Sequence, residues 1–155
     1  MKIKVNYLAI PLVVLAAALL GSFFTGQGMN WYDSLTLPKI APAGSLIGAA
    51  WTIIYVLGTA SALLVWNKVY VKKIPFKILA LFSSNAILNA AWTLIFFTWH
   101  QIGWSIIEML VLNLTTLALI IIFWKKFKIV SALLIPYFIW VSFATYLAYQ
   151  IWRLN

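Results

Sequence analysis

Three tryptophans lie inside long apolar runs of this sequence, where an indole ring must pack against protein or ligand and find a partner for its N–H. Each belongs to a stripe of residues spaced three or four positions apart, as on one face of a helix. The stripes comprise Trp51 and Tyr55, then Asn85, Asn89 and Trp92, and finally Tyr137, Trp140 and Ala144. For the aromatic residues alone, ordinary helix–helix packing explains these stripes. A ligand pocket is the alternative.

Two asparagines favour the pocket. Asn85 and Asn89 lie deep in an apolar run, and polar side chains at such depth face the bundle interior and bond to a neighbour or a ligand. An inter-helix hydrogen bond of this kind contributes only about 0.6 kcal/mol on average. Because cross-linking helices is a modest benefit, we expect at least one asparagine to serve the pocket, while both roles stay open.

Other residues that could carry chemistry are sparse. Glu108 is the only acid inside an apolar run, which makes it a functional candidate. It lies about 7.5 Å from the end of its helix, so contact with interfacial water or pairing with Lys39 or Arg153 is the simpler expectation. His100 stands alone in a turn, and no metal site is expected. The sequence has no Cys, and no nucleophile–base pair, paired carboxylates or phosphate loop is recognisable.

The apolar runs predict the helices that position these residues. The chain has 155 residues, of which 65% are hydrophobic and 8% charged, and a soluble domain of this size could not bury so much apolar surface. Runs of about 20 apolar residues suffice to cross a bilayer. We therefore predict an all-α integral membrane bundle of five transmembrane helices in a single domain, 1–155, with spans at about 5–24, 44–66, 78–98, 103–124 and 129–152.

A loop is predicted at 25–43, because Gly26, Gly28, Pro38 and Pro42 are expected to break any helix there. At about 19 residues it exceeds most connections, and loops of such length are usually functional or disordered. Helical rise places Trp51 and Trp92 roughly 9–11 Å below the outer ends of their helices. The pocket is thus expected beneath this loop, and the roof is expected to include Trp31, Tyr32 and Pro42.

Charge predicts the orientation. Eleven Lys and Arg against two acids give a net charge of +9, and their clustering between apolar runs is typical of membrane topology rather than nucleic-acid binding. One side would hold Lys2, Lys4, Lys68, Lys72, Lys73, Lys77, Lys125, Lys126 and Lys128. The other would hold only Lys39 and Arg153. The positive-inside rule places the N-terminus in the cytoplasm and the C-terminus outside, in a prokaryotic cell membrane.

Small residues recur four positions apart in two of the predicted helices. The patterns are Ala17-x-x-x-Gly21, Gly44-x-x-x-Gly48 and Gly58-x-x-x-Ala62. Such spacing allows close helix approach or dimer contact. We expect packing within the monomer to be its use.

Four motifs together resemble the TspO/MBR family, known as tryptophan-rich sensory proteins, translocator proteins or peripheral-type benzodiazepine receptors. They are Trp31-Tyr32-x-x-Leu35-x-x-Pro38-x-x-x-Pro42, Trp51-x-x-x-Tyr55-x-x-Gly58, Asn89-x-x-Trp92-x-x-x-Phe96-Phe97 and Pro136-Tyr137-x-x-Trp140-x-x-Phe143-Ala144. The resemblance covers essentially the whole chain. It implies a five-helix bundle in membrane lipid, usually a homodimer, that binds tetrapyrroles such as protoporphyrin IX and haem, and in some members sterols or benzodiazepine-site ligands.

The resemblance also implies functional positions. Family pocket residues fall on Trp31, Tyr32, Trp51, Asn89, Trp140 and Ala144. A weak sterol-recognition pattern falls on Leu147, Tyr149 and Arg153. A macrocycle would stack on Trp51 and Trp140 while Asn89 offers a hydrogen bond.

Four interpretations of the function stay open at this point. We expect a membrane protein that binds porphyrin-type ligands and requires no cofactor. A tetrapyrrole transporter would use the same pocket as a waypoint. A light-dependent porphyrin-degrading enzyme would use Trp51 and Trp140 as redox partners, although no acid–base apparatus for that chemistry is recognisable in the sequence. A sensory role would act through a partner protein.

Overall fold

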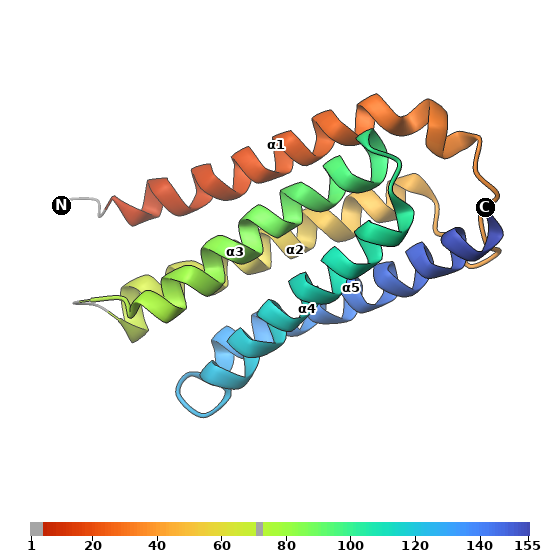
Figure 1. The fold of residues 1–155 in the computed structure, drawn as a ribbon. Coiled ribbons are helices and arrows are strands. Elements are labelled where there is room, and N and C mark those ends of the chain that lie inside the picture. Colours follow the sequence, from red (N-terminus) through yellow and green to blue (C-terminus); the bar gives the residue numbers. More distant parts are fainter. Residues whose placement is uncertain (1–4, 71–72) are drawn as a thin grey trace.

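Long antiparallel helices make up the whole described fold (Figure 1), and the computed structural model describes residues 5–70 and 73–155. The helices are α1 (Asn6–Asp33), α2 (Gly44–Leu64), α3 (Phe76–Thr93), α4 (Ile102–Trp124) and α5 (Lys128–Leu154). Short π-helical turns, η1 (Val65–Val69) and η2 (Leu94–Thr98), extend α2 and α3. Five helical segments are long and apolar enough to cross a bilayer. The predicted all-α fold class is confirmed.

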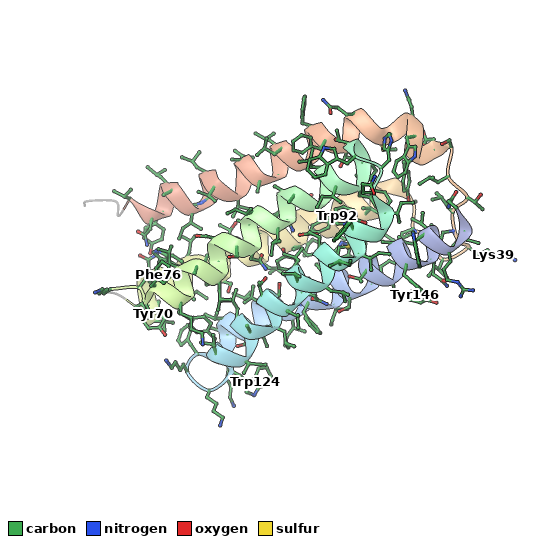
Figure 2. The ribbon with its side chains drawn as sticks, in the orientation of Figure 1. Lys39, Tyr70, Phe76, Trp92, Trp124 and Tyr146 are labelled. Carbon is green, nitrogen blue, oxygen red and sulfur yellow. The ribbon has the colours of Figure 1, made fainter. Side chains whose placement is uncertain are left out.

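The two ends of the bundle differ in what they carry. Figure 2 shows Lys39 at one end, which we call the outer end, and Tyr70, Phe76 and Trp124 at the opposite, inner end. At the inner end, the Lys126 ammonium lies 3.4 Å from the Tyr70 hydroxyl and links the α4–α5 turn to the end of η1. Three of the basic residues counted above, Lys2, Lys4 and Lys72, lie outside the described residues.

The first helix is longer than predicted. α1 continues through Gly26 and Gly28 to Asp33, whereas the sequence predicted an end near Phe24 and a loop at 25–43. A glycine weakens a helix by only about 1 kcal/mol, and Gly28 has a packing role, because a Cβ there would collide with the backbone carbonyl of Phe97. The connection is therefore the shorter segment 34–43, and Trp31 and Tyr32 belong to the last turn of α1.

α1 packs against α3 and η2 through a face of small residues. Its buried residues are Ala17, Gly21 and Gly28. A Cβ at Gly21 would lie 3.7 Å from the Thr93 side chain, so helix contact is close along this face. Figure 1 shows α1 running beside the outer part of α3. The predicted use of Ala17-x-x-x-Gly21 in packing within the monomer matches this contact.

The densest part of the core lies between α4 and α5. Met109, Leu112 and Phe123 of α4 and Val130 and Val141 of α5 are almost completely buried. Hydrogen bonds reinforce the pair, because the Ser131 hydroxyl donates to the Ile120 carbonyl at 2.8 Å and the Asn113 amide donates to the Ser142 hydroxyl at 2.7 Å. The other helices pack against this pair, α2 on α5 and α3 on α4.

Candidate ligand-binding site

A cavity of about 720 Å³ occupies the outer half of the bundle, within the roughly 300–1,000 Å³ range of small-molecule sites. Residues of α1, α2, α3, η2 and α5 line it, together with Pro42 of the connecting segment. Eight predicted site residues are in its lining: Tyr32, Pro42, Trp51, Tyr55, Asn89, Trp92, Trp140 and Ala144. The helical spacing of the stripes therefore brings most of the predicted residues to one site.

Aromatic rings from three helical segments form much of the cavity wall. Trp51 of α2 stacks on Trp92 of α3 with ring centroids 6.3 Å apart, and Trp92 stacks on Phe96 of η2 at 5.5 Å. From α5, Trp140 and Phe143 line the cavity as a second aromatic pair at 5.7 Å. Such rings offer large flat apolar faces to a ligand. Figure 2 shows Trp92 directed into the bundle interior.

The π-helical turn η2 places two consecutive phenylalanines in the interior. Phe96 is 2% exposed and Phe97 8% exposed, and both line the cavity. In a regular helix, neighbouring side chains point about 100° apart, whereas the wider π turn inserts an extra residue and changes this spacing. Such turns are frequent at functional sites.

A hydrogen-bonded layer closes the cavity on its inner side. The Tyr55 hydroxyl donates to Asn89 Oδ1 at 2.7 Å, and Asn89 Nδ2 donates to the Tyr137 hydroxyl at 2.8 Å. A smaller cavity of about 80 Å³ lies on the other side and shares Tyr55 and Asn89 in its lining. We call Tyr55, Asn89 and Tyr137 the polar floor, since they join α2, α3 and α5 between the two cavities.

Asn85 and Tyr137, two predicted site residues, do not line the larger cavity. Asn85 Nδ2 donates to the hydroxyls of Thr115 at 3.1 Å and Thr116 at 2.8 Å, which ties α3 to α4. Tyr137 supports Asn89 from α5. Both residues line the smaller cavity, so their place in the fold is beneath the site rather than in its wall.

Trp31 lies at the outer end of α1 and also falls outside the lining of the larger cavity. Its ring stacks on His100 at 4.2 Å and meets the edge of Phe96 at 5.5 Å. His100 has a left-handed φ of 55° just after η2, where the chain turns into α4. Trp31 therefore supports Phe96 by direct ring contact without lining the cavity itself. No cluster of three metal-ligating residues occurs in the part of the chain that the structure describes.

The segment 34–43 covers the outer end of the site and is held there by Asn155. The Thr36 N–H donates to Asn155 Oδ1 at 2.9 Å, and Asn155 Nδ2 donates to the Thr36 carbonyl at 3.1 Å. Pro42 of this segment, which we call the roof, lines the cavity. Sequence reasoning missed Asn155, and no signal in the sequence connects it to a residue 119 positions away.

The three residues of the sterol-recognition pattern do not lie together. Leu147 is buried and lines the cavity. Tyr149 is 41% exposed and its ring packs against Trp152 at 6.2 Å, while Arg153 is exposed near the end of α5. Two residues of separation place Leu147 and Tyr149 on nearly opposite sides of a helix. Of the three residues, only Leu147 therefore lines the cavity.

Glu108 does not form the predicted ion pair. Its side chain is 8% exposed, and neither carboxylate oxygen has a hydrogen-bond partner among the described residues. Depth alone suggested that it would reach Lys39 or Arg153, but its position on α4 turns it into the bundle. The pairing expectation is wrong, and Glu108 is a buried acid without a partner in the described part of the chain.

Two indole N–H groups in the cavity wall also lack partners. Trp92 Nε1 and Trp140 Nε1 are buried, and no described residue accepts a hydrogen bond from either. A buried donor without an acceptor costs about 1–3 kcal/mol. Neither nitrogen is exposed to the cavity, so pairing either one with a ligand would need the indole ring to rotate.

Sequence reasoning missed the contribution of α1 and the start of α2. Thr25, Gly26 and Met29 line the cavity from α1, and Gly44 and Gly48 line it from α2. The α1 residues were missed because the helix was predicted to end near Phe24. Gly44-x-x-x-Gly48 was interpreted as a packing pattern, but a Cβ at either glycine would meet nothing within 4 Å. Spacing alone cannot separate a packing glycine from one beside a cavity.

Comparison with known proteins adds a family assignment to this geometry. The TspO/MBR family model matches residues 9–153. The chain is similar to the translocator protein of Homo sapiens, with 30% identity over 135 residues that cover 86% of this chain and 79% of the human protein. It is also similar to the tryptophan-rich protein TspO of Bacillus cereus, with 34% identity and 81% of each chain covered. An uncharacterized membrane protein of Bacillus subtilis, YtaB, is 31% identical over 100% of this chain and 99% of its own length.

Proposed function

Because the chain belongs to the TspO/MBR family and is an integral membrane protein with five apolar helices, we propose that its outer cavity binds porphyrin-type tetrapyrroles. The observation that carries this proposal is the wall of aromatic rings around about 720 Å³. A flat macrocycle gains most where rings present faces to it, since stacking depends on area rather than on a fixed hydrogen-bond pattern.

Three side chains have distinct parts in this proposal. Trp51 and Trp140 provide stacking faces from α2 and α5. Trp92 and Trp140 also have indole N–H groups without a hydrogen-bond partner among the described residues. If these indole rings rotated toward the cavity, their N–H groups could donate to the carboxylates of a porphyrin such as protoporphyrin IX or haem. Pairing these donors would recover the cost of leaving them unsatisfied.

Asn89 contributes to the proposed site mainly by holding its inner boundary. Its carbonyl oxygen accepts from Tyr55 and its amide donates to Tyr137, which leaves one amide hydrogen for a ligand. The polar floor separates the outer cavity from the inner one. This arrangement favours a binding protein over a passage across the bilayer.

We also infer the orientation. Lys68, Lys73 and Lys77 lie on η1 or near the start of α3, and Lys125, Lys126 and Lys128 lie at the α4–α5 turn, all at the inner end. Among the residues that the structure describes, the basic residues of the outer end are only Lys39 and Arg153. By the positive-inside rule the inner end faces the cytoplasm, and the cavity lies in the outer leaflet.

A titration with protoporphyrin IX in lipid nanodiscs tests the proposed function. Trp51→Ala should weaken binding by at least about tenfold, because it removes a stacked ring and its buried area. Trp66→Ala is the matched control, since Trp66 packs on Phe82 at 5.3 Å near the inner end and does not line the cavity. Equal affinities for two variants that unfold at similar temperatures would refute the assignment of the site.

A further inference from the structure

The outer cavity has an open side between α1 and α2. Six residues that line the cavity are nevertheless exposed on the outside of the bundle, Ser22, Gly26 and Met29 on α1 and Gly44, Gly48 and Thr52 on α2. All except Met29 are small. A Cβ at Gly26 or Gly48 would meet nothing within 4 Å, so open space lies beside both helices here. We call this gap the side opening.

The packing of α1 explains the gap. α1 approaches α3 and η2 closely through Gly21 and Gly28, where added side-chain atoms would meet Thr93 and Phe97. Ser22 and Gly26 flank the cavity on the exposed side of α1, whereas Gly21 lines it from the buried side. Close contact on one side of α1 and open space on the other leave the cavity wall incomplete toward α2.

The side opening lies at the depth of lipid acyl chains. α2 begins at Gly44, so Gly48 and Thr52 lie about 6 Å and 12 Å along the helix. α1 ends at Asp33, so Gly26 and Ser22 lie about 10 Å and 16 Å from its outer end. The hydrocarbon core of a bilayer is about 30 Å thick, so when the helix ends lie near the interface, Gly48, Thr52 and Gly26 fall within its outer half and Ser22 lies near its midplane. The gap therefore faces hydrocarbon rather than water.

Access to the cavity from the aqueous phase is blocked by the roof. The roof lies over the outer end of the cavity, and two hydrogen bonds between the Asn155 side chain and the Thr36 backbone, one donated by each residue, hold it in place. Pro42 of the roof is part of the cavity lining. A ligand arriving from water would have to displace this segment, whereas a ligand dissolved in the membrane meets small side chains at the side opening, with Met29 as the one large side chain in the exposed lining.

We propose that a flat lipophilic ligand enters and leaves the cavity sideways, from the acyl-chain region of the outer leaflet through the side opening. This proposal rests on the proposed function, because it concerns the route to the same cavity. Under this proposal, Gly26 and Gly48 influence the rate at which ligand exchanges between the cavity and the membrane. Their lack of a side chain keeps the gap wide enough for the edge of a macrocycle.

Stopped-flow fluorescence with protoporphyrin IX in lipid nanodiscs tests the route. Gly26→Phe and Gly48→Phe place a ring in the gap from either wall, and the open space at both positions lets the fold accept it. Ile53→Phe is the matched control, since Ile53 is exposed on α2 and does not line the cavity. We expect association and dissociation both to slow by about tenfold or more in the glycine variants, and no change of either rate in Ile53→Phe.

Two outcomes would overturn the route. Unchanged rates in glycine variants that bind with normal affinity would show that the gap is not used. Faster exchange in Asn155→Ala, with unchanged rates in the glycine variants, would assign entry to the roof. If the wild-type protein binds no protoporphyrin at all, the proposed function fails first and the route falls with it, so the two failures are distinguishable.

Discussion

Gly28 is the point at which the packing of α1 can be tested most directly. A Cβ at this position would collide with the carbonyl oxygen of Phe97 and would lie 2.7 Å from the Phe97 Cβ. Most of the obstacle is backbone, which cannot rotate away as a side chain can. Gly28→Ala must therefore push α1 away from η2 or distort the turn.

The expected size of the effect follows from two opposing contributions. Overpacking a well-packed site costs about 1–3 kcal/mol, and a backbone obstacle places this substitution at the upper end of that range. Replacing glycine by alanine within a helix returns about 1 kcal/mol. We expect a net loss of roughly 2 kcal/mol in the free energy of unfolding.

Gly26→Ala is the matched control on the same helix. A Cβ at Gly26 would meet nothing within 4 Å, so only the favourable helix contribution remains and stability should rise by about 0.5–1 kcal/mol. Thermal unfolding in detergent, followed by circular dichroism, compares the two variants. If Gly28→Ala unfolds at the same temperature as Gly26→Ala or above it, the close approach of α1 to η2 is refuted.

Three other substitutions probe the interior and the roof. Tyr137→Phe should lower the unfolding free energy by about 1–3 kcal/mol, because it leaves the Asn89 amide unpaired, whereas Tyr146→Phe on the exposed face of α5 should have little effect in the same thermal assay. Glu108→Gln should maintain or raise the unfolding temperature, since a buried carboxylate without a partner is costly; a clear fall would indicate a missed ion pair. Asn155→Ala should speed amide exchange in the roof with little change in unfolding temperature, and unchanged exchange would contradict the tether.

The sequence predicts the spans well because hydropathy sums over about 20 residues, so single exceptions average out. Helical spacing likewise brings Trp51, Trp92 and Trp140 to one cavity, because the period of 3.6 residues per turn holds within each span. These successes depend on local regularities. Porphyrin binding, the homodimer and the orientation stay predictions.

The features that could not be predicted depend on contacts between distant segments. Gly28 packs closely against the Phe97 backbone within helix α1. The sequence shows a glycine at this position but does not show which distant residue packs against it. Asn155 reaches the roof only in the folded bundle. The direction of Glu108 depends on how α4 is rotated against its neighbours, which depth along the helix does not determine.

The π-helical turn η2 has a consequence for chain length. Because a π turn is an extra residue inserted into a regular helix, removing one residue from 94–98 would restore regular winding and leave the helix on either side in nearly the same orientation. The segment would then have one residue fewer to fill the interior positions of Phe96 and Phe97. A deletion here should therefore change the cavity wall more than the helix packing around it. A homologue that is one residue shorter at this point should have a differently shaped cavity wall.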